Sequence, residues 1–494
     1  MLEQFERSAE CSKADFDAAE PGLRVDLLNV QTDLHESGAQ VLIVIAGDDR
    51  LATEEMVDLV NEWMDARLID TESFERPDDT EQRMPRFWRF WRVAPTAGRI
   101  ALFHHAWATS LITQRLLEEI DDDAFERGLR HAAWFEREMV AGAVVVLKFW
   151  LHLPDKARKS RLKRARRHPR AEWQIEERDF FVGERIDEIM PLAERLLRAT
   201  DTPGAPWHIV ESSDDRHRDL TVMTTIRDAL QRRAQQPAAP SAPAPPPPAT
   251  IPDALDAVEL DRAVPTPEYN ERLERAQERL HTLSLESRRA DLSSVLVFEG
   301  WDAAGKGGAI RRLTRAMPAR NYRVVRIAAP TEEERARHYL WRFWRRLPLP
   351  GRMTIFDRSW YGRVLVERVE GFAREDEWRR AYAEIVDFEA QLVEHGVVLC
   401  KFWLHIDADE QQRRFEARAE SPYKKHKLTP EDHRNRKQRP AYEAAVNEML
   451  ARTVAPGAPW TLVGATDKRW ARLRVLDTVC DALEAALSRR GADH

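Results

Sequence analysis

The sequence lacks the features that mark several common classes of protein. It has only three cysteines, Cys11, Cys400 and Cys480, which are too few and too scattered for a disulfide framework and indicate a reducing compartment. No apolar run is long enough to cross a bilayer, and residues 1–7 lack the basic-then-apolar order of a secretory signal. We therefore expect a cytoplasmic protein without a membrane partner.

An excess of basic charge is also missing, because the formal net charge is −7. This balance argues against nucleic acid as a partner, although it leaves room for a local basic site. The hydrophobic fraction of 43% suits a globular protein. A chain of 494 residues exceeds one ordinary hydrophobic core, so we expect two or more domains.

Prolines are densest in one stretch, residues 234–252, which contains the run PAPPPP at 243–248. A segment rich in alanine and proline cannot build a hydrophobic core and favours the extended polyproline II conformation. We predict a linker here between a first domain, residues 1–233, and a second domain, residues 253–494. A proline-rich ligand for another protein is the alternative interpretation, and composition alone supports it weakly.

The two flanks of this stretch are copies of one domain. Three blocks recur at a constant offset of 253 residues (341 − 88 = 253): WRFWR at 88–92 and 341–345, KFWLH at 148–152 and 401–405, and PGAPW at 203–207 and 456–460. Gly47 and Gly300 have the same offset. A period as long as a whole domain indicates a tandem duplication and not a solenoid.

Short apolar segments alternate with helical patterns in each copy. The predicted strands are residues 41–46, 100–103, 144–150 and 207–210, and residues 295–298, 354–356, 397–403 and 460–463. The clearest predicted helices are residues 23–34, 269–287 and 377–394. This alternation predicts a parallel sheet covered on both faces. The fold class is therefore α/β, with two tandem P-loop-type three-layer α/β/α domains and helical lids.

A glycine-rich turn follows the first predicted strand of the second copy. It fits G-x-x-x-x-G-K through Gly300, Gly305 and Lys306, although Gly307 stands where a P-loop has Ser or Thr. Backbone amides and a helix start can cradle a phosphate there, and the lysine adds a mobile cation. The expected phosphate-binding residues are Gly300, Ala303, Gly305, Lys306, Gly307 and Gly308. A plain glycine turn with a surface lysine is the alternative.

The missing hydroxyl at position 307 means that other groups must hold a metal ion. Asp302 lies inside the turn, and Asp357 follows the second strand, so the two carboxylates could hold Mg²⁺ between phosphate oxygens. Turn formation by Asp302 and helix capping by Asp357 are the alternatives. Arg358 follows directly and could place its donors on a transferring phosphoryl group, or form a surface ion pair.

Basic residues gather in two further places in the second copy. Arg342, Arg345 and Arg346 are interleaved with aromatic residues that we expect to pack in the core. Lys424, Lys425 and Lys427, followed by Lys437, lie in a segment broken by prolines, which predicts a helical lid over a multiply charged phosphate. Solvated basic faces are the alternative for both groups.

The second copy resembles the polyphosphate kinase 2 family over nearly its whole length. The likeness rests on G-x-D-x-x-G-K-G at 300–307, FDRSWY at 356–361, ERV at 367–369, WRFWRRLP at 341–348 and YKKHKLTPED at 423–432. The duplicated architecture resembles the class II branch, the polyphosphate:AMP phosphotransferases. That likeness implies phosphoryl transfer from inorganic polyphosphate to AMP, giving ADP, with Mg²⁺ as cofactor and Mn²⁺ as a second candidate.

The resemblance also assigns roles to residues. Asp302, Lys306, Asp357 and Arg358 match the family's catalytic positions. The lid lysines match residues that face the polyphosphate channel, and we expect Arg342, Arg345, Arg346 and Arg363 to add cations for the polyphosphate. Use of ADP or GDP as acceptor, the reverse direction, an ATP-dependent small-molecule kinase and a non-catalytic polyphosphate-binding scaffold are the competing functions.

The first copy has lost these groups. At the offset of 253, Lys306 corresponds to Thr53, and Asp357 and Arg358 correspond to His104 and His105. New carboxylates at Glu54 and Glu55 would repel phosphate. We therefore predict that the first copy does not transfer phosphoryl groups and instead pairs with the second as an internal pseudo-dimer. Its basic residues 158–170 leave polyphosphate binding open, and a further homo-oligomer is also left open.

Overall fold

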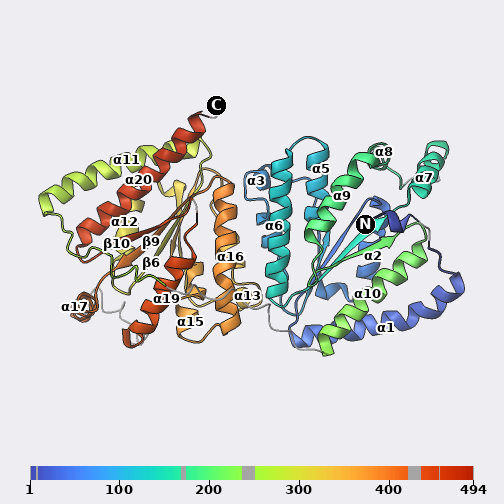
Figure 1. The fold of residues 1–494 in the computed structure, drawn as a ribbon, viewed down its shortest axis with the longest axis horizontal. Coiled ribbons are helices and arrows are strands. Elements are labelled where there is room, and N and C mark those ends of the chain that lie inside the picture. The colour runs from blue at the N-terminus through green and yellow to red at the C-terminus, as the bar shows by residue number, and fades with distance from the viewer. Residues whose placement is uncertain are drawn as a thin grey trace. The chain divides into compact units, whose positions relative to one another are not determined.

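A computed structural model describes residues 2–6, 9–168, 174–235, 251–420, 436–455 and 457–492. The described chain forms two compact units. Unit 1 contains residues 2–78, 86–235 and 332–341, and unit 2 contains residues 79–85, 251–331 and 342–492. Figure 1 shows that each unit has a central sheet with helices on both of its faces.

The sheet of unit 1 has five parallel strands in the order β2-β3-β1-β4-β5. The strands are β1 Val41–Gly47, β2 Ile69–Ser73, β3 Ile100–His104, β4 Val145–His152 and β5 Trp207–Glu211. β1 is the apolar run VLIVIAG, and its first six residues are buried because helices cover both faces of the central strand. This strand ends at the position that corresponds to the phosphate loop.

Two groups of helices cover the sheet of unit 1. Helices α1, α2 and α10 pack together on one face, and α5, α6 and α9 pack on the other. The helical elements of this repeat are η1 Leu2–Phe5, α1 Lys13–Ser37, α2 Arg50–Trp63, η2 Ala66–Leu68, α3 Asp79–Gln82, α4 Trp88–Arg92, α5 Ala106–Leu116, α6 Asp122–Ala141, α7 Asp155–Arg167, α8 Glu177–Glu184, α9 Ile186–Thr200 and α10 Asp215–Gln235.

Unit 2 repeats the arrangement, with five parallel strands in the order β10-β9-β6-β8-β7. The strands are β6 Ser294–Gly300, β7 Tyr322–Arg326, β8 Met353–Asp357, β9 Val398–His405 and β10 Trp460–Gly464. The helical elements of the second repeat, of which α13 and the first residue of α14 are grouped with unit 1, are α11 Thr266–Arg289, α12 Lys306–Ala316, η3 Ala319–Asn321, α13 Glu332–Arg335, α14 Trp341–Trp344, η4 Trp360–Arg363, α15 Val366–Val369, α16 Glu375–Glu394, α17 Ala408–Ala419, α19 Arg439–Arg452 and α20 Lys468–Ala492.

The structure confirms the predicted fold class and all eight predicted strands, and it adds one strand to each sheet. β2 and β7 were not predicted, because both are short edge strands that keep exposed polar residues, IDTES and YRVVR. Most of the predicted linker, residues 236–250, lies outside the described residues, and α10 extends to Gln235, two residues into it. No described helix is long and apolar enough to cross a membrane.

A short segment of each repeat is grouped with the residues of the other repeat. These segments, Asp79–Pro85 in unit 2 and Glu332–Trp341 in unit 1, begin 253 residues apart (332 − 79 = 253). Within unit 1, the carbonyl oxygen of Ala336 accepts hydrogen bonds from Ala97 N and from Gln40 Nε2, both at 2.8 Å. Each compact unit is therefore completed by a segment from the opposite half of the sequence.

Both units keep the same buried ion pair behind the sheet. Lys148 Nζ lies 2.6 Å from Glu136 Oε2 in unit 1, and Lys401 Nζ lies 2.7 Å from Glu389 Oε2 in unit 2. Each ammonium also donates to a threonine carbonyl oxygen, that of Thr200 or Thr453. A charge buried without its partner is strongly destabilising. Because the intact and the altered repeat both retain the pair, we assign it to the fold and not to the chemistry.

Candidate active site

The glycine-rich turn of unit 2 joins the end of β6 to the start of α12. Gly300 has φ of 141°, and a Cβ built there would meet the backbone oxygen of Leu404 at 2.4 Å. Gly305 has φ of 115° and caps α12, which begins at Lys306. Both positions require glycine, the first for close approach and the second for its backbone conformation. The strand, turn and helix follow in the order that the motif predicts.

Lys306 lies over the turn that it follows. Its Nζ donates to the carbonyl oxygen of Gly300 at 2.6 Å and to that of Trp301 at 3.3 Å. The ammonium is thus held at the mouth of the turn, close to the positive end of α12. An anionic phosphate placed here would meet both the helix end and a mobile cation.

Arg414 supports the turn from α17, and it was not among the predicted site residues. Its guanidinium donates to the carbonyl oxygens of Ala303 and Ala304, both at 2.9 Å, and to those of Ala465 and Thr466 at 2.7 and 2.9 Å. The side chain is 6% exposed, and burial lowers the pKa of the Arg414 guanidinium. Its Nε donates to Glu410 Oε1 at 2.6 Å. Because its other donors are used on backbone oxygens, Arg414 fixes the shape of the turn.

A second support reaches Asp302. Gln411 Nε2 donates to the backbone oxygen of Asp302 at 3.1 Å, and Arg439 Nη1 donates to Gln411 Oε1 at 3.2 Å. The Arg439 guanidinium also lies 4.3 Å from the ring centre of Trp301. These contacts tie α17 and α19, which flank the predicted lid, to the phosphate turn.

The structure brings Asp302 and Arg358 together. Arg358 Nη2 lies 3.1 Å from Asp302 Oδ1. Asp357 is the last residue of β8 and pairs in register with Phe298 of β6, so it ends a strand beside the turn. Arg358 has φ of 65° and its backbone nitrogen donates to Phe298 O at 3.0 Å. A left-handed backbone at a non-glycine residue costs free energy and is common at functional sites.

The carboxylates of Asp302 and Asp357 could hold a metal ion. Among the described residues there is no group of three or more His, Cys, Asp or Glu side chains with metal-site geometry. Mg²⁺ commonly binds through one or two carboxylates, with the rest of its shell supplied by water and substrate phosphates. Asp357 ends β8 and Asp302 stands two residues after the end of β6. Carboxylates are the ligand type that suits a divalent ion arriving with a phosphate substrate, and the assignment of a metal to these two residues stays a prediction.

Glu299 and Ser359 form a buried pair beside these residues. Ser359 Oγ donates to Glu299 Oε1 at 2.8 Å, and the two residues are 2% and 5% exposed. Burial raises the pKa of Glu299, while the Ser359 hydrogen bond and the charges of Lys306 and Arg358 act in the opposite direction. This pair was not among the predicted site residues, although a comparison of the two repeats could have identified it. The first repeat has Ala46 and Ala106 at these positions.

A cation from α20 also lies at the turn. A Cβ built on Gly308 would meet Arg472 Nη2 at 3.6 Å and its Nε at 3.7 Å. The corresponding residue of the first repeat is Asp219 (472 − 253 = 219). Arg472 was not predicted because it lies far from every motif in the sequence. The reversal of charge between the two repeats could have identified it.

The predicted polyphosphate residues have different surroundings. Arg342 is buried and donates to the backbone oxygen of Ala328 at 3.1 Å. Arg345 and Lys437 are exposed and Arg346 is half-buried. Arg363 lies 3.2 Å from Glu367. The three lid lysines, Lys424, Lys425 and Lys427, lie outside the described residues. The assignment of all these cations to polyphosphate stays a prediction.

The corresponding turn of unit 1 is filled by its own side chains. Arg50 pairs with Glu54 and with Asp179 of α8, both at 2.7 Å. Asp49, which corresponds to Asp302, accepts hydrogen bonds from Arg161 and Ser212, also at 2.7 Å. The cavity that remains is about 20 Å³, roughly the space of one water molecule. No phosphate fits there while these ion pairs stand.

The cations of the catalytic set also have no counterpart in unit 1. His104 Nε2 lies 3.2 Å from Thr53 Oγ1, and the rings of His104 and His105 stack at 3.7 Å. Burial lowers the pKa of His104 to about 4 and that of His105 to about 3. Both rings are therefore neutral near pH 7 and supply no positive charge for a phosphate.

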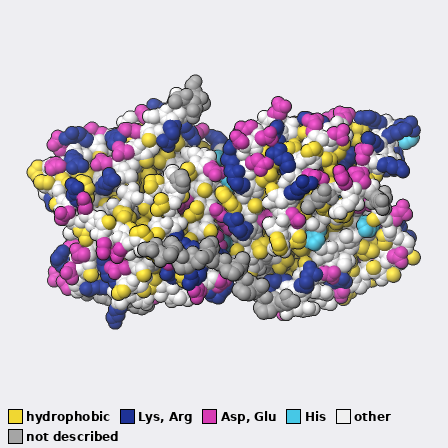
Figure 2. All heavy atoms as spheres, in the orientation of Figure 1, with side chains coloured by type: hydrophobic (Ala, Val, Ile, Leu, Met, Phe, Trp, Pro, Cys, Tyr) yellow, Lys and Arg dark blue, Asp and Glu magenta, His cyan; other side chains and the backbone are white. Residues whose placement is uncertain are grey.

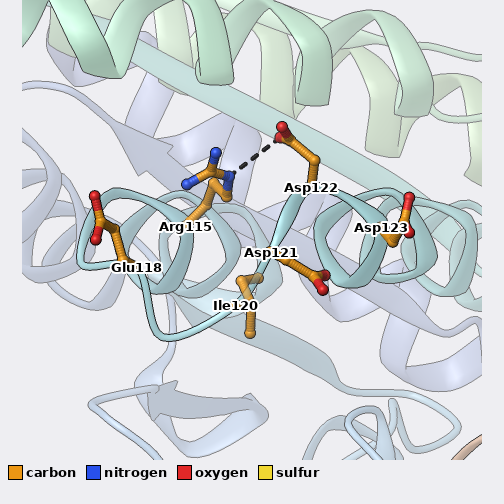
Figure 3. A pocket seen from close by; sticks show the side chains of 6 residues that line it. All are labelled: Arg115, Glu118, Ile120, Asp121, Asp122 and Asp123. Carbon is orange, nitrogen blue, oxygen red and sulfur yellow. Dashed lines mark hydrogen bonds and ion pairs between the residues drawn. The ribbon is translucent and has the colours of Figure 1, made fainter.

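A larger hollow in unit 1 lies between the end of α5 and the start of α6 (Figure 3). It is lined by Arg115, Glu118, Ile120, Asp121, Asp122 and Asp123. Arg115 Nε lies 3.1 Å from Asp122 Oδ1, which leaves a mainly acidic surface. An anionic substrate is therefore not expected to bind in this hollow.

Comparisons with known proteins agree with the repeat. Residues 10–238 and 264–491 both match the family model described as polyphosphate kinase 2. The chain is 42% identical to a polyphosphate:AMP phosphotransferase of Pseudomonas syringae pv. tomato, over 99% of both chains. It is 44% identical to a polyphosphate:AMP phosphotransferase of Pseudomonas aeruginosa, over 99% of this chain and 100% of the relative. A crystal structure described as that of a candidate polyphosphate kinase 2 from P. aeruginosa PA01 superposes with a TM-score of 0.89 at 42% identity, covering 99% of this chain and 100% of that one.

Proposed function

Because this chain belongs to the polyphosphate kinase 2 family and is an enzyme, we propose that it transfers a phosphoryl group from inorganic polyphosphate to AMP, giving ADP. The observation that carries the proposal is that the site is intact in unit 2 and altered in unit 1. The phosphate turn, Lys306 and the Asp302–Arg358 pair occur together in unit 2, and unit 1 has lost them within the same fold. The full-length relatives named polyphosphate:AMP phosphotransferase support AMP as the acceptor.

The reaction is a displacement at phosphorus. A phosphate oxygen of AMP forms a bond to the terminal phosphorus of polyphosphate, the bond from that phosphorus to the bridging oxygen breaks, and polyphosphate shortened by one unit leaves. The attacking oxygen is already anionic, so no strong general base is needed. The enzyme must instead align two anions and neutralise their repulsion.

The residues of unit 2 supply these functions. Lys306 and the amides at the start of α12 would hold the phosphates of the donor, and Arg358 would place its donors on the group in transfer. Asp302 would orient Arg358 through their ion pair. A divalent cation, Mg²⁺ or Mn²⁺, held by Asp302 and Asp357 would screen the phosphate charges.

A coupled set of assays tests the proposal. The protein is incubated with AMP, Mg²⁺ and polyphosphate, and ADP is measured directly. Parallel reactions replace polyphosphate by ATP, or AMP by ADP or GDP, and a further pair adds a chelator and then restores Mg²⁺ or Mn²⁺. ADP formed from AMP and polyphosphate, with loss on chelation, supports the proposal. Efficient use of ATP, or product from GDP but none from AMP, contradicts it.

The role of unit 1 and the location of the protein are also proposals. We infer that unit 1 pairs with unit 2 as an internal pseudo-dimer, because each unit contains a segment of the other repeat. The three cysteines are unpaired, which supports the reducing cytoplasm as the location.

A further inference from the structure

Helix α7 of unit 1 carries a stripe of four cations, Lys156, Lys159, Lys163 and Arg167, which we call the α7 stripe. These positions are separated by three or four residues, so they follow one face of the helix over about 16 Å. All four side chains are exposed. Figure 2 shows Lys and Arg side chains gathered over α7 at one end of the drawn face.

Few carboxylates neutralise the α7 stripe. Lys159 lies 2.5 Å from Asp155, and Asp187 also acts on its charge. Lys156, Lys163 and Arg167 have no ion pair with any residue in the described part of the chain. Exposed pairs such as that of Lys159 are weak. The stripe therefore offers a surface of one charge sign in a protein whose formal net charge is −7.

The other repeat has a carboxylate at three of the same positions and a neutral glutamine at the fourth. With the offset of 253, the stripe corresponds to Asp409, Gln412, Glu416 and Glu420 on and just after α17. α7 and α17 begin at equivalent positions and both support their turns through Arg161 and Arg414. The stripe is thus not a shared feature of the fold.

We propose that the α7 stripe is a non-catalytic binding surface for long-chain inorganic polyphosphate. This inference rests on the proposed function, which makes polyphosphate the donor. A linear polyanion matches a row of exposed cations by charge and shape. α7 carries no aromatic residue, and the ring of Phe180 on the neighbouring α8 is faced by Arg166 at 5.1 Å. The stripe itself therefore lacks the row of stacking rings that single-stranded nucleic acids commonly use. The filled turn of unit 1 means that binding there leads to no transfer.

The stripe would act by tethering. A long chain held on unit 1 stays on the same protein as the catalytic turn, which raises its effective concentration at unit 2. A chain of three phosphates is too short to gain from a second contact. Long chains should therefore depend on the stripe, and tripolyphosphate should not.

The test uses the full chain and a variant that takes the residues of the other repeat: Lys156→Asp, Lys159→Gln, Lys163→Glu and Arg167→Glu. The matched control makes the same changes at four exposed cations elsewhere in unit 1, namely Lys13, Arg67, Arg198 and Arg232. Affinity for end-labelled long-chain polyphosphate is measured without AMP, at several salt concentrations. KM and kcat are measured with long chains and with tripolyphosphate, and melting curves verify that each variant folds.

We expect the stripe variant to bind long-chain polyphosphate about tenfold or more weakly, with a shallower salt dependence. Its kcat and its KM for tripolyphosphate should stay within twofold of the parent. Unchanged long-chain affinity, or an equal loss in the control variant, would overturn the proposal. So would single-stranded DNA of equal charge that competes as well as polyphosphate. If no ADP forms from AMP but binding of long-chain polyphosphate still depends on the stripe, the proposed function is wrong and the proposal of a polyphosphate-binding surface on α7 is retained.

Discussion

Ser359 Oγ donates a 2.8 Å hydrogen bond to Glu299 Oε1 across the ends of β8 and β6. The bond links the residue after Arg358 to the residue before Gly300, so it joins the two segments that carry the proposed chemistry. It is absent from the first repeat, where Ala46 and Ala106 take these places. We interpret Glu299 and Ser359 as positioning residues that set the backbone of Arg358.

Replacing Ser359 by Ala should lower kcat about ten- to a hundredfold, as loss of supporting hydrogen bonds around a site commonly does. The left-handed Arg358 backbone would lose a neighbouring constraint, while KM for AMP should change less. Ser359→Thr keeps the hydroxyl and should retain most activity. The matched control, Ala106→Ser in unit 1, should leave activity unchanged. A Ser359→Ala enzyme with full kcat would show that the pair serves only the fold.

Lys306→Ala should reduce kcat by about two to three orders of magnitude, because it removes a cation that neutralises phosphate charge. Thr53→Ala changes the corresponding residue of unit 1, where Thr53 Oγ1 donates to Arg50 O at 2.7 Å. This second variant should cost about 1 kcal/mol of stability and little activity. Initial rates of ADP formation and melting midpoints separate the two effects. Equal loss of activity in both variants would mean that unit 1 takes part in catalysis.

The glycines of the turn should differ sharply in their tolerance. Gly300→Ala would place a Cβ 2.4 Å from the backbone oxygen of Leu404 at φ of 141°, so we expect a loss of roughly 1–3 kcal/mol or more and an inactive turn. Gly307→Ala meets no atom within 4 Å and has an ordinary φ. It should fold normally and keep measurable activity. Unfolding midpoints and rates, taken together, check this contrast.

The stability of unit 1 should fall in acid through His104. Burial lowers its pKa from 6.5 to about 4 in the folded state, so the unfolded chain binds more protons between these values. The contribution is therefore complete above pH 6.5 and is lost as the pH falls toward 4, at up to about 1.4 kcal/mol per pH unit. Melting midpoints at pH 5 and pH 7 should differ less for His104→Gln than for the parent. The exposed His168→Gln is the control, and an equal reduction in both would contradict this assignment.

The predictable part of the fold was its buried part. The central strands, such as β1 and β6, are continuous apolar runs, and the motif at Gly300 has one structural context that suits it. The edge strands β2 and β7 could not be found by the same rule because most of their side chains are at least partly exposed to solvent. They are strands because they pair with β3 and β8, and a local apolar run is not needed for that pairing.

The candidate site divides in the same way. Asp302, Lys306, Asp357 and Arg358 stand next to glycines or strand ends in a short motif, so local sequence identifies them. Arg414 and Arg472 reach the turn from helices more than 100 residues away, and only tertiary structure brings them there. Comparison of the two repeats recovers part of this information. Positions that keep polar residues in both, such as Lys148 and Lys401, serve the core, and positions altered in one repeat point to the chemistry.

We expect the exchanged segments to make unit 2 dependent on the first repeat. Residues 253–494 expressed alone would leave Glu332–Trp341 without its partners in unit 1. The carbonyl of Ala336 would lose its donors Ala97 and Gln40, and Trp341 Nε1 would lose the Arg92 oxygen at 3.1 Å. The fragment would also lack the Arg83 contacts with Asp291 and His395 in unit 2. The hydrogen bonds of Gln40 and Trp341 are partly buried and the Arg83 contacts are exposed. An ordinary intramolecular hydrogen bond contributes about 0.5–1.5 kcal/mol, so the loss of several together should lower the melting midpoint and the activity. Adding residues 1–252 as a separate chain should restore both, because it returns the missing partners without a covalent link. A fragment with the parent's melting midpoint and full ADP formation would contradict the pseudo-dimer.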